Sequence, residues 1–180
     1  YKYQMPGEKD STRSELYLFD FQNKTHKEID VSAFKNQNNG LWSKKMSKST
    51  PDDAPRILNW MGTNEYFYMY RTSRDQKRID LLKVNTNGKT EVLVEEKSNV
   101  YLDIQRPLFF NNEKEFVFWS ERDGWGHLYL YDSKGTIKNQ ITKGEFFISG
   151  VEGVDEKSRK LFFTANGKEQ NENPYYNHLY

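Results

Sequence analysis

The chain has 180 residues, of which 35% are hydrophobic and 16% aromatic, and this is enough apolar material to bury a core. Its 27 lysines and arginines against 26 aspartates and glutamates give a formal net charge of +1, so no global field favours nucleic acid or an anionic membrane. The lack of cysteine excludes disulfides, thiolate metal sites and a cysteine nucleophile. No apolar run approaches the roughly 20 residues that span a bilayer.

Short aromatic or β-branched segments, most of them with alternating apolar residues, follow one another along the chain and predict strands. They occupy 15–21, 26–31, 55–60, 65–70, 78–84, 91–95, 107–110, 115–119, 127–131 and 160–164. Turn signals rich in Asn, Gly and Lys separate these segments. Helical spacing of apolar residues never persists beyond about two turns. The pattern therefore predicts an all-β fold.

One pattern of strand, charged or polar turn, strand, glycine turn and strand occurs three times, at 64–96, 113–144 and 158–180. Gly88 and Gly135 occupy equivalent turns, and the tripeptide His-Leu-Tyr at 127–129 recurs at 178–180. With one further strand before a unit, four antiparallel strands recur about every 50 residues, which is the period of a β-propeller blade. We therefore predict antiparallel four-stranded blades.

The repeat divides the chain into blades and parts of blades. We expect the end of a blade at 1–32, a long connection at 33–53, blades at 54–97 and 98–144, and an incomplete blade at 145–180. Closed propellers use roughly 4 to 8 blades, so this chain would begin and end within blades. Because such ends leave sheet edges and apolar faces uncovered, we expect the isolated chain to self-associate.

Several long motifs resemble the propeller of the dipeptidyl peptidase IV branch of the prolyl oligopeptidase family. They are YKYQMPGEKDSTRSELYLFD at 1–20, YRTSRDQKRIDLLKVNTNGKTEVLVEE at 70–96, SERDGWGHLYLYD at 120–132 followed by QITKGEF, and NPYYNHLY at 173–180. The likeness covers nearly the whole chain, and motifs of mixed chemistry agree in order. It departs at 33–53, which is longer and richer in Lys and Ser than the usual connection.

The resemblance implies a serine exopeptidase that releases N-terminal Xaa-Pro or Xaa-Ala dipeptides. In that family an eight-bladed N-terminal propeller lies over a C-terminal α/β-hydrolase domain, which is absent from this chain. This chain would be about half of the propeller, and it would wall and gate the substrate cavity. The implied partners are peptide substrates and the hydrolase domain, with no nucleic acid, no metal and no cofactor. The implied location is periplasmic, secreted or at the cell surface.

The sequence offers no catalytic residue of its own. The family's serine lies in an elbow of type G-x-S-x-G; Ser149 is followed by Gly150, but Phe147 stands in the place of the first glycine. The histidines at 26, 127 and 178 fall in repeated strands, where we expect structural or exposed roles.

The family's substrate anchor is a pair of adjacent glutamates, which would lie upstream of Tyr1. Adjacent carboxylates also occur at Glu95 and Glu96 and at Asp52 and Asp53. We interpret both pairs as solvated charge beside turns.

The stretch VYLDIQRP at 100–107 is the candidate substrate-binding segment. It resembles a connection between blades that faces the cavity in the family. If it is extended, Tyr101 and Asp103 lie on one side and offer an aromatic ring and a carboxylate. The competing interpretation is a plain crossover with Tyr101 packed on the next blade.

A non-catalytic propeller that binds protein or carbohydrate is the alternative function. Exposed aromatic rings stack on sugars or anchor interfaces. Trp60 and Trp119 lie in predicted strands and Trp42 in the long loop, so Trp125 in the charged turn is the candidate platform. The lysines of KKMSK at 44–48 are interpreted as part of a solvated connection.

Overall fold

The computed structural model describes residues 15–42, 44–45, 57–58 and 65–180. Within these ranges every regular element is a β-strand and every strand pairing is antiparallel. No helix in the described part of the chain is long and apolar enough to cross a membrane. The chain divides into two compact units, Tyr1–Tyr101 and Leu102–Tyr180.

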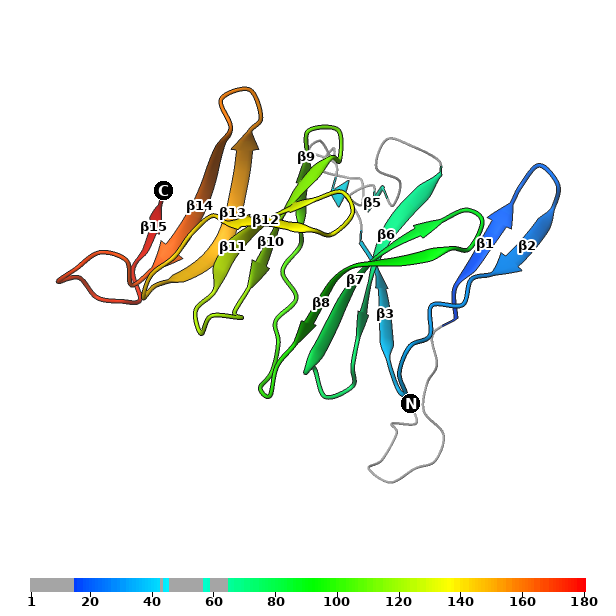
Figure 1. Ribbon diagram of the computed structural model, residues 1–180, viewed down its shortest axis with the longest axis horizontal. Coiled ribbons are helices and arrows are strands. Elements are labelled where there is room, and N and C mark those ends of the chain that lie inside the picture. Colours follow the sequence, from blue (N-terminus) through cyan, green and yellow to red (C-terminus); the bar gives the residue numbers. More distant parts are fainter. Residues whose placement is uncertain (1–14, 43, 46–56, 59–64) are drawn as a thin grey trace, which may run out of the picture. The chain divides into compact units, whose positions relative to one another are not determined.

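The first unit contains a four-stranded sheet with the strand order β3-β6-β7-β8 (Figure 1). Its strands are β3 (Asn38–Leu41), β6 (Tyr66–Thr72), β7 (Arg78–Asn85) and β8 (Thr90–Lys97). Six of the seven residues of β6 are buried, because its sequence YFYMYRT is apolar or aromatic on both faces. Such a central strand needs cover on both sides of the sheet.

Two short hairpins complete the described part of this unit. β1 (Tyr17–Asp20) pairs with β2 (Thr25–Glu28), and β4 (Lys44–Lys45) pairs with β5 (Ile57–Leu58). The segment after β2 contributes to a buried cluster with β6 and β7, against which two leucines of the β1 region pack. The cluster consists of Ile29, Val31, Phe67, Met69, Leu82 and Val84, with Leu16 and Leu18 packed on it.

One predicted strand has a different partner from the one that we expected. We predicted that 55–60 supplies the fourth strand of the blade at 54–97, but Asn38–Leu41 pairs with β6 instead, and Ile57–Leu58 pairs with Lys44–Lys45. The sequence NNGL has no apolar alternation, because a mostly exposed edge strand needs only backbone hydrogen bonds on one side. The sheet therefore reaches back into the range predicted as a connection.

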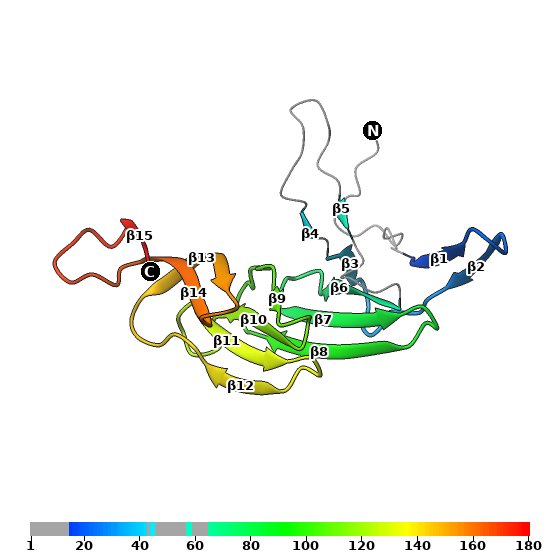
Figure 2. The same ribbon diagram turned by 90° about the horizontal axis from the view of Figure 1, so that it is seen from above.

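The second unit contains two sheets (Figures 1 and 2). The four-stranded sheet consists of β9 (Leu108–Phe110), β10 (Glu115–Ser120), β11 (His127–Asp132) and β12 (Ile137–Gln140), and the three-stranded sheet of β13 (Phe147–Asp155), β14 (Lys160–Asn166) and β15 (Asn177–Leu179). The predicted strands at 107–110, 115–119, 127–131 and 160–164 are confirmed to within two residues.

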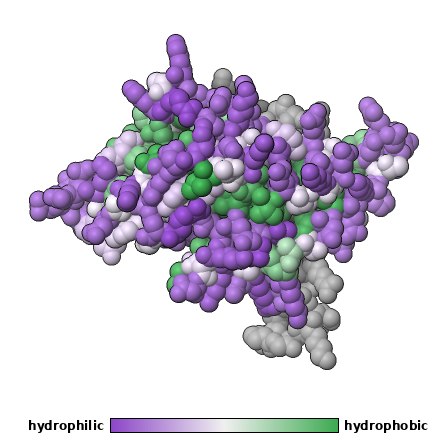
Figure 3. Space-filling view, in the orientation of Figure 1, coloured by the Kyte–Doolittle hydropathy of each residue, from purple (hydrophilic) through white to green (hydrophobic). Residues whose placement is uncertain are grey.

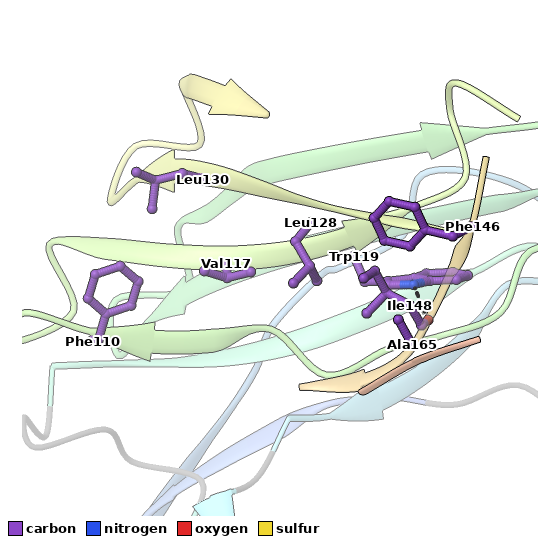
Figure 4. Packing of buried hydrophobic residues seen from close by; sticks show 8 residues of the cluster. All are labelled: Phe110, Val117, Trp119, Leu128, Leu130, Phe146, Ile148 and Ala165. Atoms are coloured by element: carbon purple, nitrogen blue, oxygen red, sulfur yellow. Dashed lines mark hydrogen bonds between the residues drawn. The ribbon is translucent and has the colours of Figure 1, made fainter. Parts of the chain in front are cut away.

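A hydrophobic cluster joins the two sheets of the second unit face to face (Figure 4). Trp119 crosses from one sheet to the other, since its Nε1 donates a hydrogen bond of 2.9 Å to the carbonyl oxygen of Ile148. Its ring also meets Phe147 edge to face, with 5.6 Å between the centroids. The buried members of the cluster are Phe110, Val117, Trp119, Leu128, Leu130, Phe146, Ile148 and Ala165.

The turns at the two ends of each sheet differ in length. Five hairpins have turns of four residues each, at 21–24, 86–89, 111–114, 133–136 and 156–159. The turns at the other end, at 73–77, 121–126 and 167–176, have five, six and ten residues.

Most of the four-residue turns are closed by the last residue of the preceding strand. Asp20, Asn85, Asp132 and Asp155 each accept backbone N–H hydrogen bonds from the turn that follows. These bonds lower the pKa of the Asp132 carboxyl group, and the bond from the Thr136 N–H contributes most. Such caps replace the hydrogen bonds that the strand would otherwise continue to make.

Gly126 lies directly before β11, beside two aromatic rings of the cluster. A Cβ atom at this position would stand 2.5 Å from Cζ2 of Trp119 and 2.8 Å from the ring of Phe147. Both rings pack in the interior between the sheets, so neither can move aside without disturbing the cluster.

Gly126→Ala should therefore destabilise the protein through overpacking. We expect a loss of about 1–3 kcal/mol in the free energy of unfolding, measured as a shift of the urea midpoint. Gly153→Ala is the matched control, because a Cβ there meets no atom within 4 Å, and it should change stability by less than about 1 kcal/mol. Equal midpoints for the Gly126 variant and the unmodified protein would contradict this account.

The first residue of β10, Glu115, is a buried carboxylate inside a charged cluster. It accepts hydrogen bonds from Arg159 Nη1 at 2.8 Å, Lys138 Nζ at 2.6 Å and Asn111 Nδ2 at 3.1 Å. These hydrogen bonds lower the pKa of Glu115 from 4.5 to about 2, and the bond from Arg159 contributes most, followed by that from Lys138. The cluster ties β10 to β12 and to the turn before β14.

Glu115→Gln should cost on the order of 2 kcal/mol of stability at neutral pH, because hydrogen bonds to a charged acceptor are lost. The pKa is lowered by folding, so the contribution is complete above the unfolded value near 4.5 and is lost as the pH falls toward about 2. Urea unfolding of both proteins at several pH values would measure this. A stability difference that stays constant between pH 7 and pH 2 would show that the carboxylate charge is not its source.

Candidate functional site

The candidate residues lie in the segment between β8 and β9, which forms no regular element. Tyr101 is 63% exposed, Leu102 is buried, and Asp103 is exposed. The competing interpretation, in which Tyr101 packs on the next blade, stays a prediction. Tyr101 ends the first unit and Asp103 belongs to the second, so each is placed here within its own unit, and their shared role in binding substrate stays a prediction.

Asp103 has a carboxylate neighbour within the second unit. Glu121 begins the turn between β10 and β11 and is half-buried. Its pKa is raised, first because burial disfavours the charged form and second because Asp103 adds a nearby negative charge. Sequence reasoning missed Glu121, since its turn was interpreted only as a connection. The charged run ERDG was the one available signal.

The same turn carries a cation and an aromatic ring. The guanidinium of Arg122 lies 4.5 Å from the centroid of the Tyr129 ring, and its Nε donates to Ser120 Oγ at 2.9 Å. Asp123 accepts a hydrogen bond of 2.6 Å from Gln140 Nε2 and thereby ties the turn to β12. Trp125 is 42% exposed, as predicted for a platform. The turn thus presents carboxylate, guanidinium and indole groups on a braced backbone.

His127 is buried and all its hydrogen-bonding capacity is used within the fold. Its Nε2 lies 2.8 Å from the carbonyl oxygen of Gly144, which can only accept, so Nε2 carries the proton. Its Nδ1 lies 3.1 Å from the Thr142 hydroxyl, which accepts from the Leu128 N–H. The imidazole thus fastens the crossover after β12 to β11, in agreement with the structural role that we expected.

Ser149 in β13 and His178 in β15 each have polar partners within the fold. Ser149 Oγ donates to Asn177 Oδ1 at 2.8 Å and is 3.1 Å from Thr164 Oγ1, so it belongs to a polar network between strands. His178 Nε2 is 2.8 Å from Glu172 Oε2 at an exposed position. In the described ranges no group of three or more His, Cys, Asp or Glu side chains could hold a metal ion.

The adjacent glutamates of β8 do not converge on one point. Glu95 is exposed and pairs with Arg78 and Lys97, whereas Glu96 is 7% exposed on the opposite face. The interpretation of both as solvated charge is wrong for Glu96, because β8 continues to Lys97 and turns this side chain inward. Two carboxylates on opposite faces cannot bind one ammonium group together. Asp52 and Asp53 lie outside the described residues.

Two of the other three tryptophans lie in the described part of the chain. Trp119 is buried between sheets, as predicted. Trp42, which we placed in a loop, is buried after β3 and meets Tyr68 edge to face at 6.3 Å. Trp60 and the lysine run beyond Lys45 lie outside the residues that the structure describes.

Replacing Asp103 should change the acidity of Glu121. In Asp103→Asn the repulsion from Asp103 is gone, so the pKa of Glu121 should fall, yet stay above its ordinary value because burial, the larger cause, remains. Carboxyl ¹³C NMR titration measures this directly. Asp155→Asn, which changes an exposed carboxylate at the end of β13, is the control and should leave the pKa of Glu121 unchanged. If the pKa of Glu121 is the same in Asp103→Asn as in the unmodified protein, the charge of Asp103 does not act on Glu121.

Comparison with known proteins places the chain in a family. Dipeptidyl peptidase 4 of Arthroderma otae is 26% identical over 103 residues, which are 55% of this chain and 13% of that protein. Dipeptidyl peptidase 4 of Trichophyton rubrum is 26% identical over 113 residues, or 59% of this chain and 15% of its own length. These matches thus cover less than a sixth of the length of either curated relative.

A solved structure and a family model extend the comparison to the whole chain. The crystal structure of Porphyromonas gingivalis dipeptidyl peptidase 4 matches with a TM-score of 0.72 and 24% identity, over 94% of this chain and 22% of that one. This agreement shows the fold, in which the antiparallel sheets are blades of a β-propeller. The model of the dipeptidyl peptidase IV N-terminal region matches residues 1–180, and the chain therefore belongs to the dipeptidyl peptidase IV N-terminal region family.

Proposed function

We propose that this chain is about half of the eight-bladed propeller of a serine-type exopeptidase that releases N-terminal Xaa-Pro or Xaa-Ala dipeptides. The match of the family model to the entire chain is the observation that carries the proposal. The relatives are named dipeptidyl peptidase 4 and are several times longer than this chain, which leaves room for a C-terminal α/β-hydrolase domain. The proposed location is periplasmic, secreted or at the cell surface.

In this proposal the segment with Tyr101 and Asp103 faces the substrate cavity. A carboxylate suits a substrate ammonium group because it accepts charge-assisted hydrogen bonds, and an exposed ring offers apolar contact to a side chain. Glu121 would add a second carboxylate whose charge depends on the occupant. A bound ammonium group favours the ionised form of Glu121 and would lower its raised pKa.

The sheets would contribute by walling the cavity and restricting entry to short, flexible peptide ends. Such a wall must be rigid, and two contacts described above support this role. Asp123 ties the turn of Glu121 to β12, and His127 fixes the next crossover. Rigid positioning of a substrate end lowers the entropy cost of reaching a reactive geometry.

A non-catalytic binding propeller is the second candidate, and the exposed indole of Trp125 favours it. The two functions differ in what the full-length protein does. A binding propeller retains a protein or glycan through Trp125 and hydrolyses no dipeptide substrate. An exopeptidase hydrolyses Gly-Pro and Ala-Pro chromogenic substrates whether or not Trp125 is present.

The full-length protein should hydrolyse Gly-Pro and Ala-Pro substrates, and the 180-residue chain alone should not. Tyr101→Ala in the full-length protein should lower kcat/KM about three- to tenfold, equivalent to about 0.7–1.4 kcal/mol. Its melting temperature should remain nearly unchanged, since Tyr101 is exposed. Phe21→Ala, an exposed aromatic in a hairpin turn, is the control for kinetics and melting.

The possible results test the exopeptidase activity and the role of Tyr101 separately. Absence of hydrolysis by the full-length protein would refute the exopeptidase. Full hydrolysis with an unchanged kcat/KM in Tyr101→Ala would keep the exopeptidase and remove Tyr101 from the site.

A further inference from the structure

The turn between β7 and β8 contains an asparagine followed by glycine, a pair that can lose the side-chain amide as ammonia. The reaction begins with attack of the glycine backbone nitrogen on the asparagine side chain, and glycine has no side chain to shield that nitrogen. Such pairs occur at 39–40, 87–88 and 166–167. They differ in how firmly the fold holds the asparagine, so the structure distinguishes among them.

Asn39 and Asn166 are held both by their side chains and by strand pairing. Asn39 Oδ1 accepts a hydrogen bond of 2.8 Å from Gln37 Nε2, and Asn39 and Gly40 both pair with β6. Asn166 Nδ2 donates to the carbonyl oxygen of Tyr175 at 3.1 Å, and Asn166 pairs with a strand on either side. Attack at either position therefore requires part of a sheet to open.

Asn87 is exposed, and its side chain makes no hydrogen bond to any residue that the structure describes. Hydrophilic residues predominate around its turn, at the right of Figure 3, so water reaches it. The Gly88 N–H donates to the carbonyl oxygen of Asn85 at 2.9 Å, and this bond must open before the nitrogen can react. Exposed turns open locally at a small cost in free energy.

The ammonium group of Lys27, in β2, lies against the peptide group that joins Asn87 to Gly88. Its Nζ donates a hydrogen bond to the carbonyl oxygen of Asn87. A Cβ atom at Gly88 would stand 3.3 Å from both Cε and Nζ of Lys27. When a peptide N–H loses its proton, resonance spreads the negative charge onto the carbonyl oxygen. An ammonium group bonded to that oxygen stabilises the charge, so Lys27 favours the reactive form of the Gly88 nitrogen.

We infer that Asn87 is a site of spontaneous deamidation and that Lys27 promotes the reaction. Hydroxide removes the Gly88 amide proton, and the nitrogen attacks Cγ of Asn87. A bond forms between these two atoms, the bond from Cγ to Nδ2 breaks, and Nδ2 takes a proton from water and leaves as ammonia. Water then opens the cyclic imide at either of its carbonyl carbons and yields aspartate or isoaspartate. Water is the only co-reactant.

Either product places a carboxylate in the residue that Lys27 contacts. In aspartate the new carboxylate is the side chain. In isoaspartate the main chain runs through Cγ, and the oxygen that accepted from Lys27 becomes part of a free carboxylate. A carboxylate binds an ammonium group more strongly than a peptide carbonyl does, so deamidation changes how the β1–β2 hairpin is held to the sheet. The inference depends on this turn alone and is independent of the proposed peptidase function.

Peptide mass spectrometry of the full-length protein after incubation at mildly alkaline pH tests the site. Replacement of the side-chain NH₂ by OH raises the mass of a peptide by about 1 Da. The peptide with Asn87 should deamidate at least about fivefold faster than those with Asn39 and Asn166, because only a turn has to open. These two peptides come from the same molecules and are the internal references.

Variants of Lys27 test the role of its charge. Lys27→Met should slow deamidation of Asn87 about three- to fivefold, as expected for the loss of one exposed ionic contact. Lys27→Arg keeps the charge and the donors and should retain most of the rate. Lys134→Met, which alters an exposed lysine in the turn between β11 and β12, is the control and should leave the rate unchanged. Circular dichroism verifies that each variant keeps its β-structure.

Three results would overturn the inference. The first is deamidation of Asn87 that is no faster than that of Asn39 and Asn166. The second is a rate in Lys27→Met that equals or exceeds the rate in the unmodified protein. The third is equal slowing in Lys27→Arg and Lys27→Met, which would show that the charge is not the cause. None of these measurements requires peptidase activity, so their failure is distinct from failure of the proposed function.

Discussion

A strand that is buried on both faces requires a neighbouring sheet on each side, and β10 is such a strand. All six of its residues are buried. Val117 and Trp119 pack on the sheet that follows. On the other face Phe116 stacks with Tyr131 of the same sheet, with 5.1 Å between the ring centroids. Val117 and Trp119 of β10 thus hold the two sheets of the second unit together in chain order. The hydrogen bond from Trp119 to Ile148 then fixes how far one sheet is displaced along the other.

The same constraint explains which strands could be predicted from the sequence. Central strands such as β6 and β10 consist mostly of apolar and aromatic residues, because packing acts on both of their faces. Edge strand β3 reads NNGL and is mostly exposed, so nothing in its composition marks it. β13 was not predicted, since two register shifts next to Gly150 and Gly153 interrupt its alternation. A bulge of this kind can be recognised only when the partner strand and its register are known.

The residues of the candidate site also differ in whether the sequence alone could predict their position. Local alternation predicted that Tyr101 and Asp103 share a side, and both are exposed next to the buried Leu102. The role of Glu121 depends on folding, because its partial burial and its neighbour Asp103 come from separate segments. Glu96 was misjudged for a related reason. A register shift opposite Leu81 and Leu82 and a strand that runs to Lys97 determine the side on which it lies.

The unequal turns of each sheet have a consequence for how such a protein changes over evolutionary time. A four-residue turn capped by Asp132 or Asp155 cannot lengthen without losing the hydrogen bonds that close it. The opposite turns carry no such fixed length, and 167–176 is already twice as long as 73–77. Insertions and deletions should therefore accumulate at one end of every sheet. A lineage could acquire new specificity there while the other end keeps the sheets in register.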